Sequence, residues 1–190
     1  RVGIWKVGFG DYALMVDKEH NLEIEWIPFV QNINLFISGV IDATLAMSYN
    51  EILQIRAAGY DISTAISIAD EGYDFPEDGL YVSEDYFRNN PQTVKAFADA
   101  SRKGWEWAQE HPEETLEIVM EKTHSNNIAT NRTHQKWMLE EVLKLNKDTE
   151  IGTATYTLKS DQVRRLSDLL VKHGMISKPV TYETITGQTL

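Results

Sequence analysis

Strand-like and helix-like segments alternate along residues 1–59, and this alternation constrains the fold more than any other feature of the sequence. Apolar runs typical of strands occur at residues 2–5, 22–29 and 40–48, and each is followed by a segment with helical character. Strands that are joined through helices pair in parallel, with the helices packed on the faces of the sheet. The pattern therefore predicts an α/β fold with a parallel sheet.

The composition changes after residue 75. Two further extended runs, at residues 64–70 and 79–85, flank a turn-rich stretch. Helices are then predicted to begin at Pro91 and Pro112, because proline lacks the N–H that a first helical position leaves unpaired. Two more helices are predicted near residues 131–146 and 160–173. We therefore divide the chain into an α/β segment, residues 1–75, and a mainly helical segment, residues 76–190.

Composition narrows the possible partners. The chain holds 18 Lys and Arg against 29 Asp and Glu, a net charge of −11, so it would repel nucleic acid and anionic membrane surfaces. No apolar run approaches the roughly 18 residues that span a bilayer, so no direct membrane insertion of this segment is expected. Cysteine is absent and the five histidines lack metal-ligand spacing, so we expect neither a metal site nor another cofactor.

A glycine-rich turn follows the first strand. Gly8, Gly10 and Ala13 form a Gly-x-Gly-x-x-Ala pattern that is close to the dinucleotide fingerprint. In dinucleotide folds the first glycine follows the strand directly, whereas Lys6 and Val7 intervene here. We therefore disfavour a nucleotide and predict that the N–H groups of this turn, at the start of a helix, face a smaller ligand. A tight turn that binds nothing is the alternative.

Polar and aromatic residues also follow the third strand. The carboxyl ends of parallel strands meet at one edge of the sheet, where α/β proteins bind ligands. Trp5, Phe9 and Tyr49 would supply apolar walls, and Asn50 and Glu51 would supply hydrogen bonds. The predicted ligand-binding residues are Trp5, Gly8, Phe9, Gly10, Tyr49, Asn50 and Glu51. The alternative is that Trp5 and Phe9 are core residues and that Asn50 and Glu51 merely start a helix.

Motifs for catalysis are missing from the sequence. It contains no Gly-x-Ser-x-Gly elbow, no Walker loop and no nucleophile placed beside a base. The carboxylates in the turn-rich stretch at residues 70–79 are typical of a solvated turn. We therefore expect no catalytic residues and no enzymatic activity.

Three stretches resemble a known family: "GVIDATLAMSYNE" at residues 39–51, the long run at residues 75–120 that begins "FPEDGLYVSED", and "NRTHQKWML" at residues 131–139. They resemble substrate-binding proteins of ABC transporters of the thiamine-pyrimidine-precursor (hydroxymethylpyrimidine) type, which are related to the alkanesulfonate, taurine and nitrate binders. The helix around residues 104–112 is shared across the wider superfamily. The Tyr-Asn-Glu at residues 49–51 is more particular to the pyrimidine-precursor branch.

The resemblance implies a periplasmic binding protein-like (type II) α/β fold with two parallel-sheet lobes that close over a ligand. Residues 1–75 would then be the second lobe. Residues 76–190 would contain the crossing segment and a mainly helical part that returns to the first lobe. Family members carry a further segment ahead of this strand, so we expect the N-terminal part of the first lobe and the signal sequence to lie outside this chain.

The function that the resemblance implies is binding of a thiamine pyrimidine precursor, or a similar heteroaromatic metabolite, for delivery to an ABC transporter permease. Its location would be periplasmic or otherwise extracytoplasmic. An alternative is the extracytoplasmic ligand-sensing domain of a histidine kinase or cyclase. A third reading is the enzymatic branch that makes the pyrimidine from pyridoxal phosphate, but that branch carries a cysteine-rich motif and this chain has no cysteine.

Overall fold

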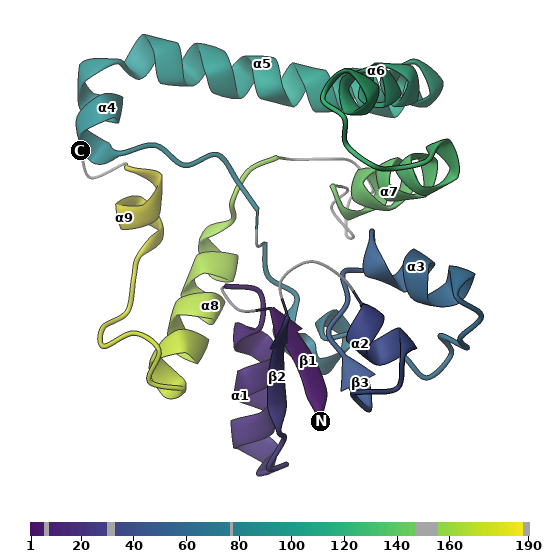
Figure 1. Cartoon of the computed structure of the whole chain (residues 1–190). Helices are drawn as coiled ribbons and strands as arrows, with labels where there is room; N and C mark the ends of the chain where they lie inside the picture. Colours follow the sequence, from purple (N-terminus) through teal and green to yellow (C-terminus); the bar gives the residue numbers. More distant parts are fainter. Residues whose placement is uncertain (6–7, 30–32, 77, 147–155, 188–190) are drawn as a thin grey trace. The chain divides into compact units, whose positions relative to one another are not determined.

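The computed structural model describes residues 1–5, 8–29, 33–76, 78–146 and 156–187 (Figure 1). Spatial proximity along the backbone divides the chain into two compact units. The first unit combines Arg1–Tyr73 with Pro112–Leu145, and the second combines Asp74–His111 with Asn146–Leu190. The proposed lobe assignment of residues 1–75 and 76–190 stays a prediction.

A small parallel sheet forms the centre of the first unit. Its strands are β1 (Val2–Trp5), β2 (Trp26–Phe29) and β3 (Ala43–Thr44). The strand order is β2-β1-β3, and β1 pairs in parallel with both neighbours. The predicted α/β architecture with a parallel sheet is thus confirmed for this unit, and it is compatible with a periplasmic binding protein-like fold.

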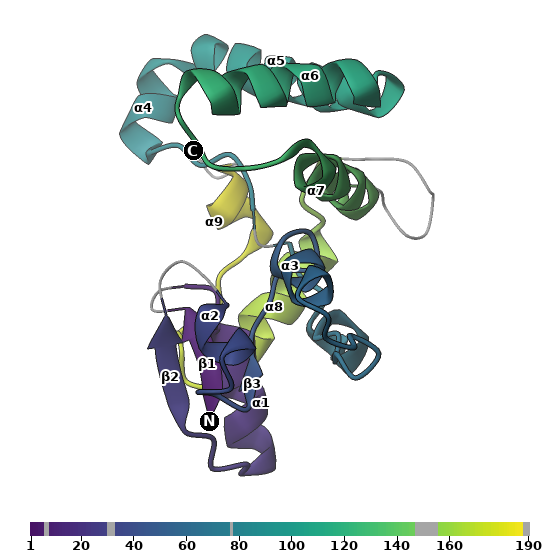
Figure 2. The same cartoon turned by 45° about the vertical axis from the view of Figure 1, so that its right-hand side comes forward.

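Helices make up most of the remaining described structure (Figures 1 and 2). In the first unit they are α1 (Asp11–His20), α2 (Asn34–Ile37), α3 (Glu51–Ala57), the short π-helix η1 (Ala69–Tyr73), α6 (Pro112–Ser125) and α7 (Arg132–Leu145). In the second unit they are α4 (Glu84–Asn89), α5 (Pro91–Glu110), α8 (Ser160–Lys172) and α9 (Tyr182–Thr186). The helix starts predicted at Pro91 and Pro112 are confirmed. None of the described helices is long and apolar enough to cross a membrane.

Two extended runs did not become strands. Residues 64–70 are irregular up to the start of η1, and residues 79–83 are irregular up to the start of α4. Ile66 and Leu80 leave 77% and 61% of their surface exposed. A sequence with high β propensity forms a strand only where its backbone can hydrogen-bond to a neighbouring strand and its apolar side chains are buried. Neither condition is met here, so the prediction of extended sheet segments in these runs is wrong.

The core of the first unit joins the sheet to its helices. Its buried apolar residues include Ile4, Ala13, Met15, Ile33, Ile41, Ile55, Leu116 and Leu143. At the start of α1 the packing is tight, because a Cβ added to Gly10 would lie 2.4 Å from Cδ1 of Ile4. The glycine turn is therefore held directly against the end of β1.

Candidate functional site

The two predicted ligand-binding loops leave the same edge of the sheet. β1 ends at Trp5 and β3 ends at Thr44, and the two strands are parallel neighbours. Leu45 continues beyond β3 and donates its N–H to the carbonyl of Gly3 at 2.9 Å. Cδ1 of Leu45 lies 3.9 Å from the position of a Cβ on Gly10. The carboxyl edge of the sheet thus brings the turn after β1 close to the chain after β3.

The glycine turn uses the conformational freedom of glycine at Gly8. Gly8 has a φ of +82°, in the left-handed region that favours glycine, and Gly10 caps α1, with its carbonyl accepting from the N–H of Leu14 at 3.1 Å. Phe9 is 48% exposed, so the alternative in which it is a core residue is wrong. Trp5 is half-buried and meets Phe9 edge to face, with ring centroids 6.3 Å apart. Two aromatic rings therefore lie beside the turn.

Asn50 and Glu51 form the start of α3. The Glu51 carboxylate turns back, so that Oε2 accepts from the N–H of Met47 at 2.9 Å and Oε1 accepts from Nδ2 of Asn50 at 2.9 Å. Tyr49, Asn50 and Glu51 are all half-buried. The expectation that these side chains start a helix is therefore met, and their binding of a ligand stays a prediction.

Asn50 also connects α3 to α7. Its Oδ1 accepts from Nε2 of Gln54 at 2.9 Å and lies 2.8 Å from Nε2 of His134. The sequence does not reveal His134 as a partner of Asn50, because 84 residues separate the two and no spacing rule relates residues on separate helices. The only signal was indirect, since His134 lies in the third of the stretches that resemble the binding-protein family.

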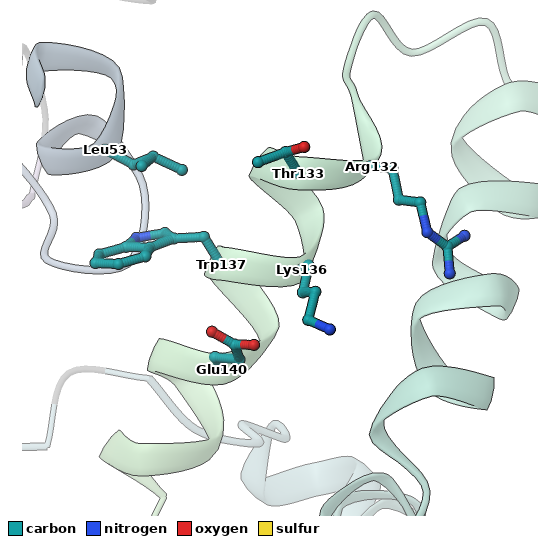
Figure 3. A pocket seen from close by; sticks show the side chains of 6 residues that line it. All are labelled: Leu53, Arg132, Thr133, Lys136, Trp137 and Glu140. Atoms are coloured by element: carbon teal, nitrogen blue, oxygen red, sulfur yellow. The ribbon is translucent and has the colours of Figure 1, made fainter. Parts of the chain in front are cut away.

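A pocket of ≈ 340 Å³ lies between α3 and α7 in the same unit (Figure 3). Its lining residues are Leu53, Arg132, Thr133, Lys136, Trp137 and Glu140. Leu53 and Trp137 face each other across it, whereas Arg132 and Lys136 point away from that apolar pair (Figure 3). Nε1 of Trp137 is buried and has no hydrogen-bond partner among the described residues. The pocket is therefore mainly an apolar gap between the two helices.

The cations beside this pocket are paired with carboxylates of α6. Nζ of Lys136 lies 2.6 Å from Oε1 of Glu113, and Arg132 pairs with both Glu117 and Glu113. The hydrogen bond from Lys136 lowers the pKa of Glu113, and the hydrogen bond from Arg132 lowers the pKa of Glu117. Because these charges compensate one another, the pocket has no surplus positive charge that would attract an anion.

No set of three histidine, aspartate or glutamate side chains within the described ranges is arranged to hold a metal ion. The hydrogen-bonding groups of the two loops are instead the Glu51 carboxylate and the Asn50 amide after β3, and the backbone N–H groups of Gly8–Gly10 after β1. Such groups suit recognition of a small polar molecule.

A protein-family model described as NMT1/THI5 like matches residues 1–115. The match covers the whole predicted ligand-binding edge, from Trp5 to Glu51, and ends before α7 begins. No curated protein and no solved structure matches the chain.

Proposed function

The chain belongs to the NMT1/THI5-like family, and from this premise we propose that it binds a thiamine pyrimidine precursor, or a similar heteroaromatic metabolite, for delivery to an ABC transporter permease. Family membership is consistent with a small-molecule binding protein. The observation that carries the proposal is that the matched residues include both loops at the carboxyl edge of the parallel sheet. Delivery to a permease would require a periplasmic or otherwise extracytoplasmic location.

The chemistry of this edge favours a flat ligand with an amino group. Glu51 supplies carboxylate oxygens that only accept hydrogen bonds, and the NH₂ group of Asn50 lies beside them. An aminopyrimidine carries an amino donor next to a ring-nitrogen acceptor, which is the complement of that pair. Trp5 and Phe9 offer ring surfaces for stacking, and the turn at Gly8–Gly10 offers backbone N–H groups.

We further propose that the protein binds its ligand without transforming it. The half-buried side chains of Asn50 and Glu51 are held in place by hydrogen bonds to each other and to neighbouring groups. Side chains fixed in this way are suited to orienting a bound ligand. Release of an unchanged ligand on denaturation would support this part of the proposal.

Titration calorimetry of the purified protein tests the proposal. Hydroxymethylpyrimidine should bind in a saturable way, and the analogue that carries an oxo group in place of the amino group should bind much more weakly. Rejection is expected because the oxo group is an acceptor and would face the Glu51 carboxylate, so the hydrogen bond from the amino group would be replaced by repulsion between two acceptors. Binding of taurine or of NAD in preference to the pyrimidine would overturn the proposal.

A further inference from the structure

The side chains of Glu51, Asn50 and His134 form a continuous hydrogen-bond network. Which atom donates and which accepts is determined at the Glu51 end. A carboxylate has no proton to donate, so the Asn50 atom that lies 2.9 Å from Oε1 of Glu51 must be the NH₂ nitrogen. If the amide were turned over, two oxygen acceptors would face each other at that distance. The oxygen of Asn50 therefore points the other way.

The assignment of donors and acceptors in this network extends to α7. Oδ1 of Asn50 can only accept, and its two neighbours are Nε2 of Gln54 at 2.9 Å and Nε2 of His134 at 2.8 Å. The ring nitrogen of His134 must then carry the hydrogen in this contact. The geometry thus requires a proton on Nε2 of His134, although the ring contact by itself would allow either tautomer.

Asn50 has one N–H left over. Its NH₂ group has two hydrogens, and Glu51 is the acceptor of one of them. Among the described residues no second acceptor is bonded to this group. The pair therefore presents one N–H donor beside the carboxylate lone pairs of Glu51, at the start of α3.

We infer that His134 is a positioning residue for ligand recognition: from α7 it holds the Asn50 amide so that its N–H, and not its carbonyl oxygen, lies beside Glu51 and faces the ligand. This inference rests on the proposed function, and it narrows the ligand to molecules with an amino group next to a ring-nitrogen acceptor. Gln54 also donates a hydrogen bond to Oδ1 of Asn50, but it lies on α3 next to Asn50. His134 provides the hydrogen bond that links Asn50 to a second helix, α7.

Nitrogen-detected NMR of the histidine rings tests the orientation without any ligand. The ring of His134 should be protonated at Nε2 in its neutral form, and His134→Leu identifies its signals. A neutral ring protonated at Nδ1 alone would overturn the inference, whatever the protein binds. This NMR measurement tests the orientation of Asn50 and His134 even if the pyrimidine does not bind and the proposed function is wrong.

Calorimetry with hydroxymethylpyrimidine tests the consequence for binding. His134→Leu should weaken the affinity by about tenfold, which corresponds to the loss of one hydrogen bond. His134→Gln keeps an N–H donor and should recover part of that loss, and the matched control His124→Leu, at an exposed position of α6, should bind like the unaltered protein. Equal affinity of His134→Leu and the unaltered protein would overturn the inference while leaving the proposed function in place.

Discussion

Glu51 shows how one side chain serves both local structure and the proposed site. Its two oxygens hold the N–H of Met47 and the NH₂ group of Asn50, so the carboxylate stabilises the turn that leads into α3. Each carboxylate oxygen can accept more than one hydrogen bond. The internal bonds therefore orient Glu51 and still leave acceptor capacity for a ligand.

Glu51→Gln should weaken binding of hydroxymethylpyrimidine by about 1.5–3 kcal/mol, the range for a hydrogen bond to a charged group. Both oxygens of Glu51 accept hydrogen bonds within the protein, so the new NH₂ group would face a donor, either the N–H of Met47 or the NH₂ group of Asn50. We therefore expect the free energy of unfolding to fall by about 1 kcal/mol. Calorimetry and urea denaturation measure the two effects. Glu121→Gln, at an exposed position of α6, is the control, and an unchanged affinity in Glu51→Gln would remove Glu51 from the site.

At the scale of elements, the packing is tight where Gly10 leads into α1. Gly10→Ala places a methyl group 2.4 Å from Cδ1 of Ile4, which is itself 8% exposed and cannot move freely. We expect this overpacking to lower the free energy of unfolding by about 1–3 kcal/mol.

The matched control for that substitution should change stability in the opposite direction. Gly104 lies inside α5, and nothing lies within 4 Å of the position of an added Cβ. Because alanine favours helix more than glycine does, Gly104→Ala should raise the free energy of unfolding by about 0.5–1 kcal/mol. Equal effects of the two substitutions in urea denaturation would contradict the packing described for Gly10.

The pairing of α6 with α7 should depend on pH. In the folded protein the pKa of Glu113 and of Glu117 lies below the usual 4.5, chiefly because Lys136 and Arg132 donate hydrogen bonds to them. A lowered pKa stabilises the fold above the unfolded value, and this contribution is lost as the pH falls through the folded-state pKa. The pKa of Lys136 is raised for the same reason, so the contribution persists up to alkaline pH.

Thermal unfolding at about pH 7 and about pH 3 would measure this effect. Acid should lower the melting temperature of the unaltered protein by more than that of Glu113→Gln, which has already lost the pairing. High salt at neutral pH should narrow the difference between the two proteins, since these charges are exposed. The same acid response in both proteins would show that Glu113 does not contribute.

Sequence patterns predicted single elements better than they predicted partners. β1 coincides with its predicted residues 2–5, because a buried strand next to a glycine turn has a strong local signature. β3 spans only Ala43–Thr44 of the predicted run at residues 40–48, since strand length depends on the neighbour with which it pairs. Both loops of the site could be predicted from strand order, whereas His134 could not, because its partner lies on another helix.

At the scale of the whole chain, each unit is built from two separate stretches of sequence. Residues 112–145 join the unit that contains the sheet, and Leu116 and Leu143 are among its buried residues. Helical periodicity predicts which side of a helix is apolar, but it does not predict which distant segment covers that side. For this reason the sequence indicated the helices at Pro112 and at residues 131–146 without indicating which unit they join.

The proposed binding of a small aminopyrimidine at the carboxyl edge of the parallel sheet is tested most directly by backbone NMR of the protein titrated with hydroxymethylpyrimidine. The largest shifts should occur at the amides of residues 8–10 and 49–51. A lesser shift is expected at His134, and α8 should be unaffected. Shifts confined to Leu53 and Trp137 of the α3–α7 pocket, or no shifts at all, would contradict the claim.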